Sequence, residues 1–141
     1  MSKVMAKDRH ETRLTWVMAA FELRTRTTKF LLGKKIPDDT KYLLNDSIFN
    51  TVDKLASTMD IISMLENPGY KLTGISLAKQ ISHAYIYVMQ LHGQLVNLVE
   101  VTNTQVLRSV SPLVEILLQI KTHLEQKYGV KMDNAKLNIN N

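Results

Sequence analysis

The sequence predicts an all-α fold, an antiparallel up-down-up-down four-helix bundle. Four segments carry apolar residues at steps of three and four, the spacing that places them on one face of a helix. The connections between these segments are short, which makes successive helices of a bundle antiparallel neighbours. With only 5 Gly and 3 Pro in 141 residues, the chain has little material for the many turns of an all-β fold.

One domain accounts for the whole chain. The length is enough for one core and too short for two. A content of 45% apolar and 22% charged residues is ordinary for a globular protein. We expect a flexible N-terminus over residues 1–10, the bundle over residues 11–128 and a flexible tail over residues 129–141, which are rich in Asn and Lys.

The first helix is predicted from its two ends. Asp8 and Glu11 have the spacing of a capping box, so we expect the helix to start there. It runs to about Leu32, because Gly33 suits a helix C-terminus. Apolar residues recur at helical spacing at Leu14, Val17, Met18 and Phe21.

The second and third helices follow. Asp38 and Asp39, which follow Pro37, are placed to start the second helix, and the Asn-Pro-Gly segment at residues 67–69 ends it. We expect the third helix to begin at Thr73. The apolar stripe of the second helix comprises Leu44, Ile48, Val52, Leu55, Met59, Ile62 and Leu65.

The start of the fourth helix has two readings. It begins near Thr104 and bends at Pro112, or it begins at Ser111, since Ser-Pro is a good N-cap and first-position pair. Its apolar stripe is the same in both cases and comprises Val106, Val110, Leu113, Leu117, Ile120 and Leu124.

Residues 80–99 in the third helix contain no Asp, Glu, Lys or Arg. About 20 residues is also the length of a membrane-spanning helix. Central polar side chains such as His83, Gln90 and His92 oppose insertion into hydrocarbon. We therefore predict a buried helix of a protein without a membrane span.

This third helix is apolar on more than one side. One stripe comprises Ile81, Tyr85, Val88, Leu95 and Leu98. A lone bundle needs only one such stripe, and a second apolar strip is typical of a subunit interface. We therefore predict a homo-oligomer; the alternative is that the N-terminal segment folds over the second strip. The predicted interface residues are Tyr85, Ile86, Met89, Val96 and Val99.

The motifs of common enzymes and metal sites are absent from the sequence. The glycines Gly69 and Gly74 have phosphate-loop spacing, but Ile75 stands where the lysine belongs. His83 and His92 are too far apart on a straight helix to share a metal, and we expect them to be hydrogen-bonded interior residues. With no Cys, thiolate chemistry is excluded and the cytoplasm is the natural compartment. We predict a non-enzymatic protein with no metal and no cofactor.

The net charge of +5 is distributed unevenly. Residues 1–35 carry +6, residues 36–66 carry −4 and residues 67–141 carry +3. The acidic segment contains an aspartate series that repeats every seven residues. This series is either a solvated face or a set of partners for cations of another subunit; its members are Asp39, Asp46, Asp53 and Asp60.

A basic cluster ends the first helix. No acid occurs from Leu23 to Ile36, and Thr25, Thr27 and Thr28 add hydroxyl groups between the cations. Such a cluster can neutralise phosphates without reading sequence, although cations near a helix C-terminus are also favoured by the helix dipole. The nucleic-acid-binding candidates are Arg24, Arg26, Lys29, Lys34 and Lys35, with Lys54, Arg108 and Lys121 outside the cluster.

The order of these features resembles a family of small four-helix bundles. The quoted features are a basic end of the first helix, then Ile36-Pro37, then D-x-x-x-x-L-x-x-x-I, and later Thr102, Gln105, Val106 and Glu115. The family contains the accessory variability determinant (Avd) of diversity-generating retroelements and the ribosomal-RNA intervening-sequence proteins. The resemblance covers roughly residues 14–128. It implies a basic, ring-like homopentamer that associates with a reverse transcriptase and its RNA and supports synthesis of mutagenised cDNA.

We therefore predict an oligomeric nucleic-acid-binding accessory protein of a reverse transcriptase, which holds RNA or an RNA/DNA hybrid. One rival is a protein-interaction or scaffold module without a nucleic-acid role, as in the intervening-sequence proteins. The other rival is a small hydrolase or metal protein with an unrecognised site.

Overall fold

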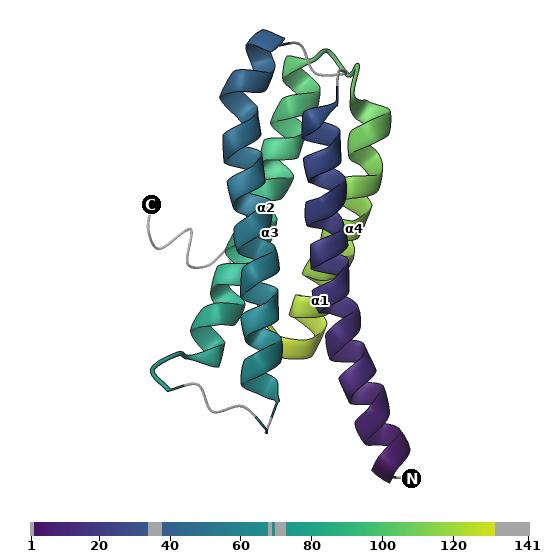
Figure 1. Ribbon diagram of the computed structural model, residues 1–141, viewed down its shortest axis with the longest axis vertical. Helices are drawn as coiled ribbons and strands as arrows, with labels where there is room; N and C mark the ends of the chain where they lie inside the picture. Colours follow the sequence, from purple (N-terminus) through teal and green to yellow (C-terminus); the bar gives the residue numbers. More distant parts are fainter. Residues whose placement is uncertain (1, 34–37, 68, 70–72, 132–141) are drawn as a thin grey trace.

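The computed structural model describes residues 2–33, 38–67, 69 and 73–131, with side chains described from Leu14 in the first helix and from Asp46 in the second. These residues form four α-helices and no strand. The helices are α1 (Ser2–Leu32), α2 (Asp38–Glu66), α3 (Leu77–Val101) and α4 (Leu107–Tyr128). The all-α prediction is confirmed (Figure 1).

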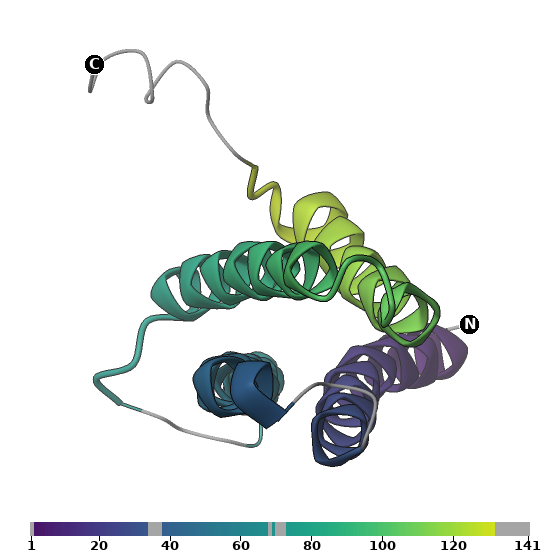
Figure 2. The same ribbon diagram turned by 90° about the horizontal axis from the view of Figure 1, so that it is seen from above.

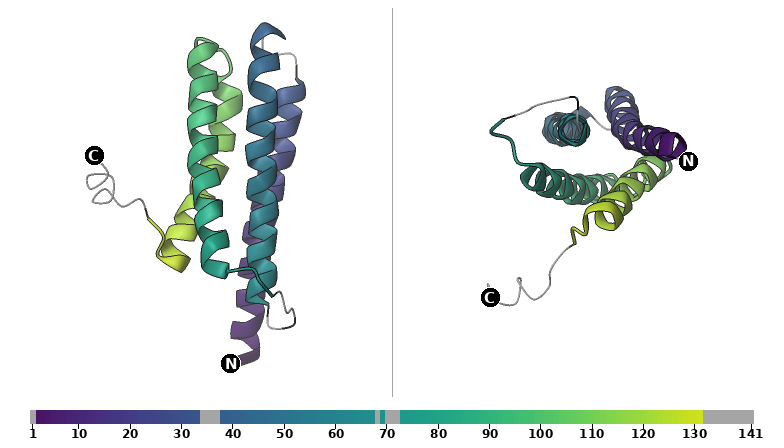
Figure 3. Two further views of the ribbon diagram at one scale, coloured as in Figure 1. Left: turned by 90° about the vertical axis from the view of Figure 1, so that its left-hand side faces the viewer. Right: turned by 90° about the horizontal axis from the view of Figure 1, so that it is seen from below.

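The four helices lie side by side around one core. Close backbone contacts join α1 to α2, α2 to α3, α3 to α4 and α4 back to α1, and none joins the diagonal pairs among the described residues. The views from above and below show this four-cornered arrangement (Figures 2 and 3). The end of α1 and the start of α2 lie at the same end of the molecule as the end of α3 and the start of α4 (Figure 1).

The apolar stripes predicted for the later helices form the core. The α4 stripe is wholly buried, as is the predicted stripe of α3. In α2, Leu65 at the end of the stripe is only half-buried, and Leu44 lies outside the described side chains. The buried members of the α2 stripe are Ile48, Val52, Leu55, Met59 and Ile62.

The inward face of α1 differs from the prediction. Of the four residues expected there, only Val17 is buried, whereas Leu14 and Met18 are exposed and Phe21 is half-buried. Apolar residues occur on both sides of this helix, so their spacing alone did not identify the inward side. The buried residues of α1 are Val17, Ala20, Leu23, Thr27 and Leu31.

The end of α1 and both ends of α2 lie where the sequence predicts. The helix α1 ends at Leu32, and the Gly33 amide donates to the Phe30 carbonyl at 3.1 Å. The helix α2 begins at Asp38 and ends at Glu66. The predicted start of α1 at Asp8 is wrong, because the helix begins at Ser2 and continues through the apparent capping box.

The predicted start of α3 at Thr73 is also wrong. Gly74 has a φ of +81°, a left-handed conformation that glycine adopts readily and that a helix does not contain. The helix begins at Leu77, after Ser76, whose hydroxyl accepts a hydrogen bond from the Lys79 amide at 3.3 Å.

The helix α4 begins at Leu107, so the reading that starts near Thr104 is the closer one and the start at Ser111 is wrong. Asn103 and Thr104 have positive φ values of 54° and 66° and form the turn before it. Val106 occupies the N-cap position without a side-chain hydrogen bond. Pro112 lies inside the helix, where it removes one backbone donor.

The helix α3 lies between α2 and α4, as each helix of this arrangement lies between two others. In the described ranges, none of the helices combines the length and the apolar character that crossing a bilayer requires.

Candidate assembly and nucleic-acid surfaces

The predicted interface strip lies on the outward side of α3. Ile86 is 50% exposed and Val96 is 41% exposed, and Met89 and Val99 are half-buried. Tyr85 differs: it is only 7% exposed, so it belongs to the core and offers little surface to another chain. The helix α1 continues to Ser2 without turning back, and it makes no close backbone contact with α3 in the described ranges.

The strip continues into an open groove between the end of α3 and the start of α4, which we call the α3–α4 groove. Its volume is about 470 Å³. The wall from α4 was not predicted, although Leu107 and Val114 are seven residues apart, a spacing that places them on one side of a helix. The lining residues are Val96, Val99, Glu100, Leu107, Val110, Ser111, Val114 and Glu115.

Two carboxylates flank this apolar groove. Glu100 on α3 and Glu115 on α4 are both exposed, and neither forms an ion pair within the part of the chain that the structure describes. The groove is therefore apolar at its floor and acidic at its rim, in a chain whose net charge is positive.

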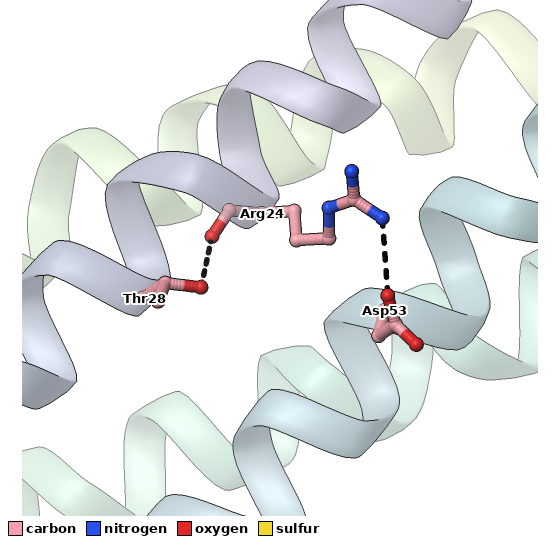
Figure 4. A network of polar contacts seen from close by, with 3 residues as sticks. All are labelled: Arg24, Thr28 and Asp53. Atoms are coloured by element: carbon pink, nitrogen blue, oxygen red, sulfur yellow. Dashed lines mark hydrogen bonds and ion pairs between the residues drawn. The ribbon is translucent and has the colours of Figure 1, made fainter.

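The first member of the basic cluster is bound within the chain. The Arg24 guanidinium donates to Asp53 Oδ1 on α2 at 3.0 Å (Figure 4). It also lies 4.8 Å from the Phe21 ring centre. Thr28 donates to the Arg24 carbonyl at 2.7 Å. Thr27 is fully buried, and its hydroxyl has no partner among the described residues. Thr27 therefore faces the core and Thr28 is bound to the backbone of its own helix, so neither hydroxyl lies beside the cations as the sequence predicts.

Other predicted cations are also paired. Arg26 Nη2 lies 2.9 Å from Glu22 Oε1 on the same helix. Lys121 Nζ lies 3.1 Å from Glu125 Oε2. Because residues two apart on a helix do not face each other, Arg24 and Arg26 do not form one patch.

Three predicted cations remain exposed without an ion pair in the described ranges. They are Lys29 on α1, Lys54 on α2 and Arg108 on α4. Lys34 and Lys35 lie outside the described residues. The structure therefore distributes the predicted nucleic-acid-binding residues over three helices.

The aspartate series divides as well. Asp53 pairs with Arg24 of its own chain, a third possibility that the sequence did not suggest. Asp46 is exposed, Asp60 is half-buried, and the side chain of Asp39 is not described. The series is therefore not one uniform face.

The histidines differ from the prediction. His83 is exposed, so its predicted interior position is wrong. His92 is half-buried, and neither side chain forms a hydrogen bond within the described part of the chain. The histidine at the centre of a network is His123 on α4, which the sequence did not single out. It stacks on Trp16 of α1 with ring centres 4.5 Å apart and meets the Tyr128 ring edge-on at 6.2 Å.

This aromatic cluster also reaches α2. Tyr128 donates to Glu66 Oε1, and Lys127 Nζ lies 3.2 Å from Glu66 Oε2. Burial, and to a lesser degree the charge of Lys127, lowers the pKa of His123 from 6.5 to about 4, while the Glu66 carboxylate opposes the change. His123 is thus neutral at pH 7 and stacks as an uncharged ring. Trp16 and His123 are more than one hundred residues apart in the sequence, so no periodic pattern along the chain predicts their contact.

The α3 side of α4 has its own polar contact. The Tyr85 hydroxyl donates to Glu125 Oε2 at 2.8 Å. This hydrogen bond and a second one from Lys121 lower the pKa of the Glu125 carboxyl.

Among the described residues, no group of three or more His, Cys, Asp or Glu side chains is placed to hold a metal ion. No protein-family model, characterised protein or solved structure matches this chain.

Proposed function

We propose that the protein is a self-assembling, non-enzymatic accessory protein whose assembled form holds nucleic acid for a reverse transcriptase of a diversity-generating retroelement. In this proposal each subunit is an antiparallel up-down-up-down bundle. The subunits form a ring in the cytoplasm, and the resemblance to Avd proteins suggests five of them.

The observation that carries the proposal is the uncovered apolar surface of α3 and α4. Val96 and Leu107 are 41% and 48% exposed and line the α3–α4 groove, and Ile86 and Leu118 are 50% and 42% exposed on the same two helices. Exposed apolar surface of this kind often marks an interaction site in soluble proteins. A second copy of the chain supplies the cover without requiring another protein.

The support for nucleic acid is the charge of the chain together with its resemblance to Avd. The net charge is +5, and Lys54 and Arg108 are exposed without ion pairs in the described ranges. In an oligomer each cation is repeated around the axis. The repetition raises the attraction for a polyanion although each single chain offers few cations.

The test is charge reversal at these two cations. Lys54→Glu with Arg108→Glu should weaken retention of an RNA hairpin, and the log–log salt dependence of binding should become less steep by about 0.7 to 0.9 for each phosphate that is no longer neutralised. The matched control is Lys79→Glu with Lys131→Glu, which makes the same change of net charge at two exposed lysines outside the predicted set. Light scattering should give the same oligomer size for both variants. If the control weakens RNA retention as much as the test variant does, the assigned cations are not a binding surface.

A second candidate function is a protein-interaction module without a nucleic-acid role. The ion pairs of Arg24, Arg26 and Lys121 favour it, because these cations already satisfy carboxylates of their own chain. The two functions differ in their response to salt. RNA retention falls steeply between about 50 and 200 mM salt, whereas a mainly apolar protein contact does not.

A further inference from the structure

A second apolar surface lies on α1, which we call the outer α1 face. Met18 is 65% exposed and Leu32 is 73% exposed, and both are larger exposures than any on α3. Leu14, Thr25 and Lys29 share this face, because the spacing 14, 18, 25, 29 and 32 steps by three, four and seven. Among the described residues of the outer α1 face, Lys29 is the charged side chain without an ion pair. Arg26 and Glu22, which lie next to this face, form an ion pair with each other.

The outer α1 face and the α3–α4 groove are complementary in charge. In the part of the chain that the structure describes, the groove has the unpaired carboxylates of Glu100 and Glu115 at its rim, and the outer α1 face has the unpaired ammonium of Lys29. Both surfaces are apolar between these charges. A groove that met its own copy would place carboxylates against carboxylates, and like charges at an interface cost several kcal/mol.

The two surfaces also lie at the same level of the bundle. Lys29 and Leu32 end α1 at the end of the molecule where α3 ends and α4 begins, which is where the groove lies (Figure 1). Copies with parallel axes therefore bring the groove of one beside Lys29 and Leu32 of the next.

We infer that the α3–α4 groove of one copy binds the outer α1 face of a second copy in a head-to-tail contact, with Leu32 against the apolar groove and Lys29 beside Glu115. This inference rests on the proposed self-assembly and names the surface that the groove recognises. A head-to-tail contact repeats from copy to copy and forms a closed ring when its rotation closes. The helices α1 and α4, which carry the two surfaces, are neighbouring corners of the bundle (Figure 2).

A charge swap tests the contact. Lys29→Glu and Glu115→Lys should each raise the dissociation constant of the assembly at least about tenfold in light scattering, because each places two like charges together. The double variant with both substitutions should assemble more tightly than either single variant. Lys54→Glu is the matched control for the same charge change on α2, and its assembly should equal that of the wild type. The circular dichroism melting curve of each variant should match that of the wild type, since all three positions are exposed.

Engineered cysteines test the same contact independently of charge, because the chain has no Cys of its own. Leu32→Cys and Leu107→Cys as separate proteins should form a disulfide-linked dimer only when mixed. One chain carrying both substitutions should give a ladder of cross-linked species that ends at the ring size. Leu107→Cys that links efficiently to itself would overturn the head-to-tail contact in favour of a symmetric one.

The two proposals fail in different ways. If the wild-type chain remains a monomer at high concentration, self-assembly itself is wrong. If the chain forms oligomers but Lys29→Glu assembles normally and the mixed cysteine variants do not link, self-assembly stands and the partner surface on α1 is wrong.

Discussion

The two halves of α4 are held in the bundle by different kinds of contact. The C-terminal half contacts all three other helices through polar and aromatic groups: His123 with Trp16 of α1, Tyr128 with Glu66 of α2, and Glu125 with Tyr85 of α3. The N-terminal half, from Leu107 to Val114, buries Val110 and Leu113 and otherwise borders the open α3–α4 groove.

This contrast between the two halves of α4 indicates how a helix can border an open groove at one end and still be held firmly in the bundle. Directional contacts at one end of α4 fix its position and rotation, because a hydrogen bond or a stacked ring pair is made at one geometry only. The other end buries Val110 and Leu113 in the core. Its outward apolar side borders the open α3–α4 groove.

The largest expected effect comes from the buried stripe that both halves share. Leu117→Ala should lower the free energy of unfolding by about 3 kcal/mol, because Leu117 is fully buried and its removal leaves a cavity. The neighbouring Leu118→Ala is the matched control. Leu118 is exposed, and its truncation should change the stability of the monomer by no more than about 0.5 kcal/mol.

Urea unfolding at low protein concentration measures both variants. If Leu118→Ala proves as destabilising as Leu117→Ala at a concentration where the chain is monomeric, the outward side of α4 is part of the core and is not available to another chain.

The next effect concerns the aromatic contact of the C-terminal half. Folding lowers the pKa of His123 from 6.5 to about 4, so in this window the unfolded chain binds a proton that the folded chain does not. His123 therefore makes the folded state less stable as the pH falls from 6.5 towards 4, and has no such effect above 6.5. Lys127 and Glu66 are the charged groups that act on it.

His123→Gln should make the decline of melting temperature between pH 6.5 and 4 less steep. His83→Gln, at an exposed position on α3, should leave the decline as in the wild type. The fluorescence of Trp16, the only Trp in the chain, should change over the same window in the wild type and not in His123→Gln. If the melting temperatures of the wild type and of His123→Gln fall identically with pH, protonation of His123 does not destabilise the folded state.

The smallest effect concerns the contact between α4 and α3. Tyr85→Phe removes the hydrogen bond that is the largest cause of the lowered pKa of Glu125. The pKa of this carboxyl should rise towards its ordinary value and stay partly lowered, because Lys121 still binds it. An NMR titration of Glu125 measures the change, with Tyr87→Phe on the same helix as the control. An unchanged titration of Glu125 in Tyr85→Phe would show that the phenol does not set its charge.

The buried stripes of α2, α3 and α4 were predicted well, and the buried side of α1 was predicted poorly. The stripes of α2 and α4 each lie on one side, so the spacing alone identified their buried residues. The helix α1 has apolar residues inward at Val17 and Leu23 and outward at Met18 and Leu32, and spacing could not rank the two sides. The second strip of α3 was recognised because residues 80–99 carry no charge that would mark an outward side.

The polar sites were the least predictable. Charge counting placed Arg24, Arg26 and Lys121 together as phosphate-binding candidates, but each has a carboxylate partner within the bundle. The i,i+4 spacing of Glu22 with Arg26 and of Lys121 with Glu125 was visible in the sequence, whereas the pairing of Arg24 with Asp53 depends on how α1 packs against α2.

The sequence by itself determined the helices, most of their ends and the residues that leave water on α2, α3 and α4, because hydrophobic spacing and Gly or Pro act locally along the chain. Only the tertiary structure decided which side of α1 faces the core, which cations already have partners, and that α3 and α4 leave an acidic-rimmed apolar groove between them. These features depend on the rotation of each helix relative to its neighbours. That rotation is set by contacts between residues far apart in the chain, such as Trp16 with His123 and Tyr85 with Glu125.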